Sequence, residues 1–416
     1  MGHAGSAERR LRGRANTLRL AISGQLGSDA LTSDAVKETM DLCVSCKGCK
    51  RECPTGVDMA KMKIEFLHHY HRRHGWKLQD KLVAYLPRYA PLASRFAPIA
   101  NAVQRFTKRV IGVADERTLP EWHGKPFLQS LPSRGQTGAA AGPGDSATPA
   151  KAPGEAVLLV DTFSNYFEPE NAHAALAVLE AAGYTVHVAR PADGGRPLCC
   201  GRTFLAAGMV DRAREEASRM LAALAPFAAR GVPIVGLEPS CLLGLRDEFL
   251  SMRLGADADA VAKQALLFEE FLAREKAEGR LALELTPLPA KRALLHGHCH
   301  QKAFGAMSAA EQALSMVPGL SVETVESSCC GMAGAFGYEA AHYEVSMKMA
   351  EASLLPAVRA ADADTFIVAD GTSCRHQIAD GAGRQAMHVA RVLASALAQG
   401  STLRRESGAV ERERES

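Results

Sequence analysis

Four cysteines stand within eleven residues near the start of the chain, and they constrain its fold more than any other feature. They occur in the run Cys43-Val-Ser-Cys46-Lys-Gly-Cys49-Lys-Arg-Glu-Cys53-Pro54. The spacing C-x2-C-x2-C-x3-C-P is the bacterial ligand pattern of a cubane iron-sulfur cluster, in which a short irregular turn directs three thiolates at one cluster. The run therefore predicts a [4Fe-4S] cluster bound by Cys43, Cys46 and Cys49, with Cys53 as a further candidate ligand.

The role of Cys53 is open at this stage. In two-cluster ferredoxins the cysteine before the proline ligates the other cluster, but this chain has only one such run. Either the four thiols serve one cluster, or another segment or polypeptide completes the ligand set. A structural zinc site is the alternative, although zinc ligands usually come as two separated pairs. No secretory leader is recognisable, so disulfides are not expected.

Composition favours a protein with several globular cores. The chain has 416 residues, 47% of them hydrophobic, and contains no apolar run of the roughly 18 residues that a membrane span needs. All eleven cysteines fall in recognisable clusters. This pattern indicates metal chemistry in a reducing compartment, and the expected location is the cytoplasm.

Charge is concentrated in the first third of the chain. Residues 1–134 contain 23 lysines and arginines against 12 acidic residues. This imbalance predicts docking to an acidic partner or an anionic surface, and the alternative is a solvated helical face. Aromatic and basic residues alternate over residues 80–113, which indicates contact with a partner or a membrane surface, or packing on the cluster domain. Binding to nucleic acid is not expected, because no binding motif accompanies the charge.

The first 132 residues read as an all-helical, ferredoxin-like domain. Helices are expected over residues 8–27, from Ser33 or Asp34 to Leu42, and from Asp58 to Gly75, with Ser, Asp and Gly as capping residues. Residues 133–155 are rich in Gly, Ala, Pro and Ser and predict a flexible linker. The charged residues 400–416 predict a disordered tail.

The region between linker and tail contains an internal repeat of strands, helices and a Cys-Cys-Gly sequence. Strands are expected at residues 156–162, 184–189 and 233–237, and again at 292–298, 321–326 and 365–370. This order predicts two α/β units with parallel sheets, at 156–290 and 291–399. The predicted fold class is therefore α+β with several domains: a helical domain followed by two α/β repeats.

Each remaining cysteine follows the predicted end of a strand. Since the carboxyl ends of parallel strands face one crevice, separate loops should bring these thiols together. The second repeat contributes Cys299, Cys329, Cys330 and Cys374, and the first contributes Cys199, Cys200 and Cys241, with Phe163 opposite Cys299. Both sets are predicted metal ligands, for an iron-sulfur or a zinc centre in the second repeat. The alternative is a set of buried, reduced cysteines with packing roles. Nearby histidines are candidate ligands, proton donors or supporting groups: His296, His298, His300 and His376.

These motifs resemble the cysteine-rich (CCG) iron-sulfur proteins, which include electron-transfer subunits of glycolate oxidase, anaerobic glycerol-3-phosphate dehydrogenase and heterodisulfide reductase. The sequence is most similar to the C-terminal half of bacterial fusions with an FAD-linked D-2-hydroxyacid dehydrogenase. The resemblance is carried by residues 12–27, 53–63, 161–170, 238–241, 296–303 and 329–339. It departs from the family pattern where C-x2-C would be expected, since Glu238 and Gly371 stand in place of cysteines.

The resemblance implies an iron-sulfur component of a flavin-dependent 2-hydroxyacid dehydrogenase system of the D-lactate, glycolate or 2-hydroxyglutarate type. An FAD-linked dehydrogenase would donate electrons as a partner subunit, and a quinone, ferredoxin or similar acceptor would receive them. No FAD-binding region is recognisable in this chain, so FAD is expected only in the partner. Two alternatives are a heterodisulfide-reductase-like thiol/disulfide reductase and a zinc-stabilised docking scaffold.

Overall fold

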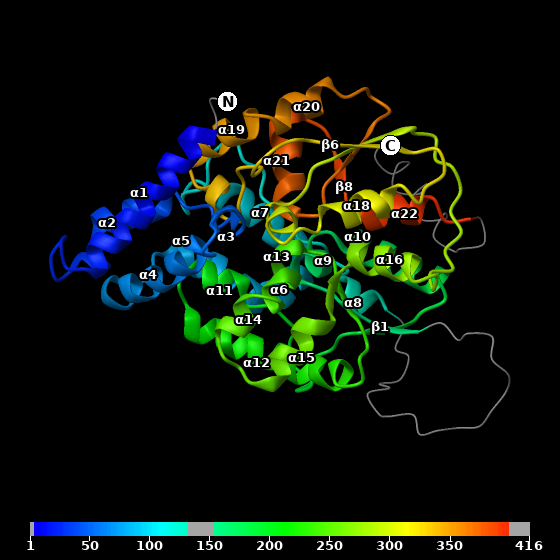
Figure 1. Ribbon diagram of the computed structural model, residues 1–416, viewed down its shortest axis with the longest axis horizontal. Helices are drawn as coiled ribbons and strands as arrows, with labels where there is room; N and C mark the ends of the chain where they lie inside the picture. The colour runs from blue at the N-terminus through cyan, green and yellow to red at the C-terminus, as the bar shows by residue number, and fades with distance from the viewer. Residues whose placement is uncertain (1–3, 132–153, 399–416) are drawn as a thin grey trace.

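The structure is a computed structural model that describes the backbone of residues 4–131 and 154–398, with side chains from residue 13 onward (Figure 1). Most of the predicted linker and the whole predicted tail lie outside the described residues. Glu155, which the prediction assigned to the linker, is the first residue of strand β1.

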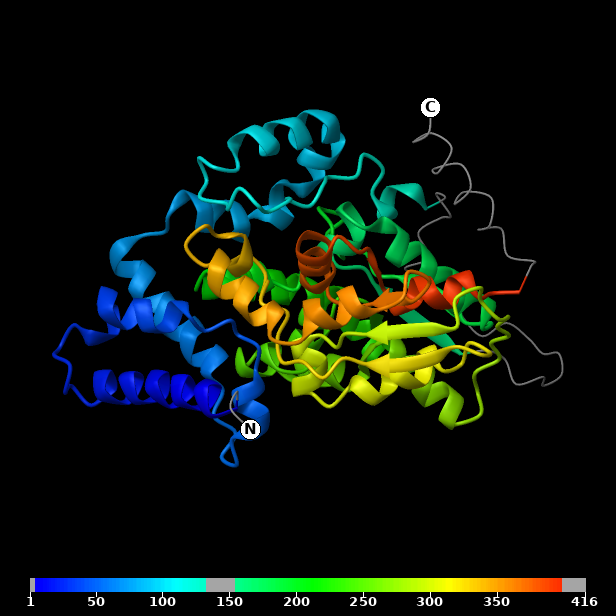
Figure 2. The same ribbon diagram turned by 90° about the horizontal axis from the view of Figure 1, so that it is seen from above.

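A small helical unit at one end of the molecule contains the cysteine run (Figures 1 and 2). It consists of α1 (Ala4–Ile22), the 3-10 turn η1 (Ala30–Thr32), α2 (Asp34–Asp41), α3 (Gly48–Glu52) and α4 (Met59–His74). The predicted caps are confirmed: the Ser33 side chain accepts a hydrogen bond from Val36 N, and Asp58 accepts from Ala60 N. The first helix was predicted too long, because the chain turns through Gly24 and Gly27 at positive φ after Ile22.

Short helices follow, as the prolines predict: α5 (Leu78–Ala84), α6 (Leu86–Arg95), α7 (Ala97–Thr107) and α8 (Phe127–Ser130). Prolines occupy the first turns of α6 and α7, where a missing N–H costs nothing. None of the helices in the described part of the chain has the length and apolar content needed to cross a membrane.

Two four-stranded parallel sheets form the rest of the molecule, which confirms the predicted α+β class with parallel sheets. The first sheet has the order β2-β1-β3-β4 and the second β6-β5-β7-β8. The strands are β1 (Glu155–Leu159), β2 (Thr185–Val188), β3 (Ile234–Gly236), β4 (Ala265–Leu267), β5 (Arg292–Leu295), β6 (Ser321–Thr324), β7 (Phe366–Val368) and β8 (Ala386–Met387). Both sheets have the same strand order, as an internal repeat would give, and β4 and β8 are the strands that the sequence did not predict.

Helices connect the strands and join the two sheets through one core. The first repeat contains α9 (Thr162–Tyr166), α10 (Pro169–Ala181), α11 (Arg202–Ala206), α12 (Val210–Ala228), α13 (Pro239–Leu245), α14 (Glu248–Ser251), α15 (Ala256–Gln264) and α16 (Phe268–Ala277). The second contains α17 (Cys299–Ala303), α18 (Met307–Leu314), η2 (Phe336–Tyr338), α19 (Tyr343–Glu351), α20 (Leu354–Ala360), α21 (Thr372–Ala382) and α22 (Val389–Ser395). Helix α10 packs against α22 and α16 against α18. Buried residues of β1 and β5 therefore belong to the same hydrophobic cluster.

Replacing Gly208 by alanine is expected to destabilise the contact between α4 and the first repeat. Gly208 has φ +69°, and an added Cβ would lie 2.6 Å from the backbone carbonyl carbon of Leu67. Backbone strain and overpacking together should cost about 2–4 kcal/mol. Gly194→Ala is the matched control, since its φ is +62° but nothing lies within 4 Å of the new Cβ. Thermal unfolding should show a clearly larger loss for Gly208→Ala, and equal losses would contradict the steric argument.

Candidate functional site

The four thiols of the second repeat lie at the carboxyl end of its sheet. Cys299 begins α17 after β5, Cys329 and Cys330 follow β6, and Cys374 lies in the first turn of α21 after β7. Three of these side chains are buried and Cys299 is partly exposed. The parallel strands thus deliver the four sulfur atoms to one edge of the sheet.

Hydrogen bonds link these thiols to one another in the order Cys299, Cys329, Cys330 and Cys374. The bond from Cys329 lowers the pKa of Cys299 to about 6. Hydrogen bonding with Cys329, and then with Cys374 and His296, lowers the pKa of Cys330, whereas hydrogen bonding within the set raises the pKa of Cys329 and of Cys374. The lowered pKa values of Cys299 and Cys330 favour the thiolate, which is the form that binds a metal.

His296 is the histidine that faces these sulfur atoms. Among the described residues, His296, Cys330 and Cys374 are the one group of potential metal ligands whose ligand atoms all lie within 4.8 Å of one another. The imidazole is almost fully buried, and burial lowers the pKa of His296. A neutral imidazole beside soft thiolates is a donor set that suits iron or zinc.

The first repeat has the same Cys-Cys-Gly geometry as the second. Gly201 N donates to Cys199 Sγ at 3.3 Å, and Gly331 N donates to Cys329 Sγ at 3.4 Å. Both glycines adopt positive φ, and an added Cβ would lie 3.0 Å from a backbone oxygen of α12 at Gly201 and 2.2 Å from one of α19 at Gly331. Only glycine therefore fits at these two positions, because each loop passes close to a helix backbone there.

The first repeat brings Cys199, Cys200 and Cys241 together in buried positions linked by hydrogen bonds. Phe163 lies in α9, so a fourth thiol is missing there, and carboxylates are present instead. Asp161 and Glu238 line a small cavity with Cys200 and Cys241. Burial, then the charge of Glu238, raises the pKa of Asp161 to about 6. The thiol site of this repeat therefore has two carboxylates beside it and one sulfur atom fewer than the site of the second repeat.

The N-terminal cysteines occupy an irregular turn ahead of α3. Ser45 and Lys47 adopt positive φ, of 52° and 59°, which lets the chain curl between the cysteines. Met59 N donates to Cys49 Sγ at 3.3 Å. Cys43, Cys46 and Cys49 interact electrostatically, whereas Cys53 is partly exposed and its Sγ lies 3.1 Å from Thr55 Oγ1. Cys53 thus stands apart from the other three.

This turn packs directly against the second repeat, an arrangement that the sequence did not predict. Helix α3 contacts α17, which begins with Cys299. Arg51 Nη1 donates to Lys302 O at 2.6 Å, and His300 Nε2 lies 3.1 Å from Ser45 O. Burial, together with the charge of Cys299, raises the pKa of Cys46 to about 12. The N-terminal thiols and those of the second repeat are therefore electrostatic neighbours.

Buried charges fix the turn to the first repeat as well. The Lys47 side chain is 1% exposed, and its Nζ lies 2.5 Å from Asp247 Oδ2 and 2.7 Å from Glu248 Oε1. Lys50 and Lys61 also pair with Asp247, at 2.7 and 2.5 Å. The alternation of lysines with cysteines in the motif was the available sequence signal for this docking, but it did not reveal the acidic partner.

Arg202 follows the first Cys-Cys-Gly sequence and lies between the two repeats. Its Nη1 donates to Glu248 Oε1 at 2.7 Å, and its Nη2 lies 3.4 Å from His300 Nε2. Its charge also acts on Cys200, Cys241 and Cys299. The guanidinium of Arg202 therefore interacts electrostatically with thiols of both repeats.

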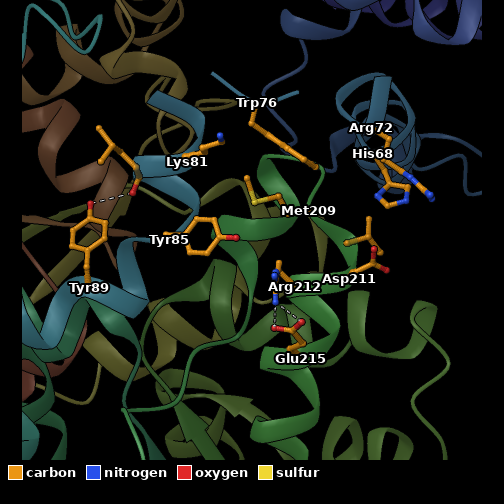
Figure 3. Close-up of a pocket in the computed structure, with 12 residues that line it drawn as sticks. His68, Arg72, Trp76, Lys81, Tyr85, Tyr89, Met209, Asp211, Arg212 and Glu215 are labelled. Carbon is orange, nitrogen blue, oxygen red and sulfur yellow. Dashed lines mark hydrogen bonds and ion pairs between the residues drawn. The ribbon is translucent and has the colours of Figure 1, made fainter. Parts of the chain in front are cut away.

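A pocket of about 910 Å³ lies between the α4–α6 region and α12 (Figure 3). Figure 3 shows Trp76, Tyr85 and Met209 around the same space, with Arg212 paired to Glu215 at its rim. No cysteine belongs to its lining. The pocket is therefore separate from the three thiol sets.

Comparison with known proteins gives a match for the second repeat. Residues 293–379 match the family model of the cysteine-rich domain, from β5 into α21. The matched segment includes all four thiols of the second repeat.

Several curated relatives cover most of the chain. It is 28% identical over 353 residues to D-2-hydroxyglutarate dehydrogenase of Pantoea ananatis, covering 83% of this chain and 33% of the relative. The match to the Escherichia coli protein of that name is 27% over 371 residues, covering 87% and 34%. A subunit of the anaerobic glycerol-3-phosphate dehydrogenase of E. coli is 26% identical over 328 residues, covering 77% and 78%. The chain thus spans about a third of the length of the 2-hydroxyglutarate dehydrogenases.

Proposed function

Because residues 293–379 form a cysteine-rich domain and the relatives are dehydrogenases or part of one, we propose that this chain is the iron-sulfur electron-transfer component of a flavin-dependent 2-hydroxyacid dehydrogenase system. The observation that carries the proposal is the contact between α3 and α17, which makes Cys46 an electrostatic neighbour of Cys299. Two candidate metal sites placed side by side suit the passage of electrons better than an isolated structural metal does.

Each thiol set has its own role in this proposal. Cys43, Cys46 and Cys49 would bind a [4Fe-4S] cluster, with Cys53 or a residue of a partner as the fourth ligand. A second iron-sulfur centre would be held by Cys299, Cys329, Cys330 and Cys374, and the first repeat would offer a further metal site at Cys199, Cys200 and Cys241. Bound clusters would supply one-electron transfer, while the protein buries the ligands, excludes water and places Lys47 and Arg202 as counter-charges.

The proposed partners are an FAD-linked dehydrogenase, which oxidises the 2-hydroxyacid in the cytoplasm, and a quinone, ferredoxin or similar acceptor. The relatives named D-2-hydroxyglutarate dehydrogenase are about three times as long as the part that this chain matches. The organic chemistry would then belong to a flavin-binding partner, since electron transfer is what this chain's donor sets suit.

Iron analysis tests this proposal and its alternatives. Anaerobically purified protein should contain iron and acid-labile sulfide, and should lose visible absorbance when an FAD-linked D-2-hydroxyacid dehydrogenase and its substrate are added. Zinc without iron would support the docking scaffold. Reduction of disulfides without any flavoprotein would support a heterodisulfide-reductase-like enzyme.

We further propose that the surface of α6, α7 and the residues just after α7 contacts a membrane, where the electron acceptor would be. This surface exposes an apolar stripe. Six large apolar residues recur at intervals of three or four and are 49–85% exposed: Leu92, Phe96, Ile99, Val103, Phe106 and Val110. In Figure 2 this cyan segment forms an outer edge of the molecule. Residues 86–112 contain five basic residues and no acidic residue, although Arg88, Arg105 and Arg109 pair with carboxylates of other segments. A basic, apolar surface of this kind suits anionic lipid.

Vesicle sedimentation tests the membrane contact. The wild-type chain should bind vesicles that contain phosphatidylglycerol, and the double variant Phe106→Glu/Val110→Glu should bind at least about 10-fold more weakly, because it loses apolar contact and adds repulsion. Leu78→Glu is the matched control, since Leu78 is 67% exposed but lies outside the stripe. Equal binding by the double variant and the control would contradict the proposal.

A further inference from the structure

We infer that His296 supplies an imidazole ligand to the metal centre of the second repeat, so that this centre has a mixed sulfur and nitrogen donor set. The inference rests on the proposed function, because it assumes that Cys299, Cys329, Cys330 and Cys374 bind iron. It adds a donor of a different chemical class to the four thiolates.

The backbone holds His296 rigidly at the edge where the thiols meet. Strand β5 ends at Leu295, and the N–H of His296 donates to the carbonyl of Val368 in β7 at 2.8 Å. The His296 side chain is 1% exposed. It is therefore fixed at the start of the loop that leads to Cys299.

Hydrogen bonding selects the tautomer that a metal ligand needs. His296 Nδ1 lies 2.9 Å from Ser327 Oγ. That hydroxyl accepts a bond from Lys302 Nζ at 3.0 Å and directs its own proton to the carbonyl of Val325 at 3.4 Å. Since a hydroxyl has only one proton to donate, Ser327 accepts from Nδ1–H. The lone pair of the neutral imidazole is then on Nε2, and this arrangement is typical of metal-bound histidines.

The remaining nitrogen faces the sulfur atoms. His296 Nε2 is buried and makes no hydrogen bond of regular geometry, and the Cys330 thiol is the side chain that acts on the imidazole as a hydrogen-bond partner. A ring nitrogen of His296 and the Sγ atoms of Cys330 and Cys374 all lie within 4.8 Å of one another. Leaving a buried nitrogen unsatisfied is costly, and metal coordination would remove that cost.

The C-x2-C pattern of the related proteins would place one more thiol near Cys374, and this chain has no cysteine there. A donor other than sulfur could take its place. Gly371 stands where the C-x2-C pattern would place a thiol before Cys374. An added Cβ at Gly371 would lie 2.4 Å from His298 Cδ2, so no side chain fits there. The neighbouring histidines have other contacts, because His298 accepts a bond from His300 N and His300 Nε2 lies 3.1 Å from Ser45 O. His296 is thus the histidine whose ring nitrogen lies beside the thiols of Cys330 and Cys374.

Pulsed electron paramagnetic resonance on the anaerobically purified full chain tests this inference. Reduced protein should show a strongly coupled nitrogen that changes its spectrum when the histidines are labelled with 15N. The coupling should disappear in His296→Ala and persist in the nearby control His376→Ala. His296→Cys should retain iron without the coupling, which separates loss of the ligand from loss of the fold.

The outcomes distinguish the inference from the function on which it rests. Protein without iron or acid-labile sulfide would overturn the proposed function. Iron-containing protein with no strongly coupled nitrogen, or with a coupling that survives in His296→Ala, would overturn the inference alone.

Discussion

A chain carrying Cys46→Ser is expected to lose the N-terminal cluster and to transfer electrons from its flavoprotein at least about 100-fold more slowly, since even outer partners of metal ligands account for about 10–100-fold effects. Cys46 lies between Cys43 and Cys49 and interacts electrostatically with both and with Cys299. Iron content, the signal of the reduced cluster and the rate of bleaching by the flavoprotein would measure the effect. The iron bound by the second repeat should remain.

Two further variants sharpen this experiment. Ser45→Ala changes a neighbouring side chain in the same turn and should leave iron content and rate unchanged. Cys53→Ser decides the open ligand question: loss of the cluster assigns Cys53 to it, and a retained cluster assigns the fourth position elsewhere. Unchanged iron in Cys46→Ser would contradict the proposed ligand set.

The variant Asp247→Asn is expected to destabilise the chain by about 3–5 kcal/mol, the usual cost of removing one member of a buried ion pair. It removes the carboxylate that lies 2.5 Å from the ammonium of Lys47, which is 1% exposed, and leaves Glu248 at 2.7 Å as its close partner. Burial raises the pKa of Asp247, but hydrogen bonds from Lys47, Lys50 and Lys61 outweigh it and hold that pKa well below its ordinary value. The stabilisation should therefore be present above pH about 4 and decrease as the pH falls further.

Thermal unfolding at neutral pH and at decreasing pH measures this effect. Glu121→Gln is the control, because the pair of Glu121 with Arg105 is exposed on both sides, and such pairs contribute about 0–1 kcal/mol. If the melting temperatures of the two variants fell equally, the buried network would not be what holds the cysteine turn in place.

Local signals in the sequence predicted the elements that carry the cysteines. Ser33 and Asp58 cap their helices as expected, and the six longer apolar runs form strands of two parallel sheets. The strands β4 and β8 have only three and two residues. A run of two residues shows no period, and Ala265–Leu267 reads as the continuation of the preceding helix.

The contacts between units could not be predicted in the same way. Lys47 and Asp247 are 200 residues apart, and Ser45 and His300 are 255 apart. Nothing in the local pattern of a single sequence pairs such residues. The histidines around the second repeat were recognised as a group, but only the structure distinguishes His296, by its bond to Ser327 and by its ring nitrogen within 4.8 Å of Cys330 and Cys374.

The position of Arg202 has a consequence for the order in which electrons would be accepted. One positive charge interacts with thiols of both repeats, so it favours an added electron on either side, while electrons held on both sides would repel each other. The two sites would then titrate as a coupled pair, with the second reduction requiring a stronger donor than the first. A chain of this design would carry single charges in succession more readily than it would store two.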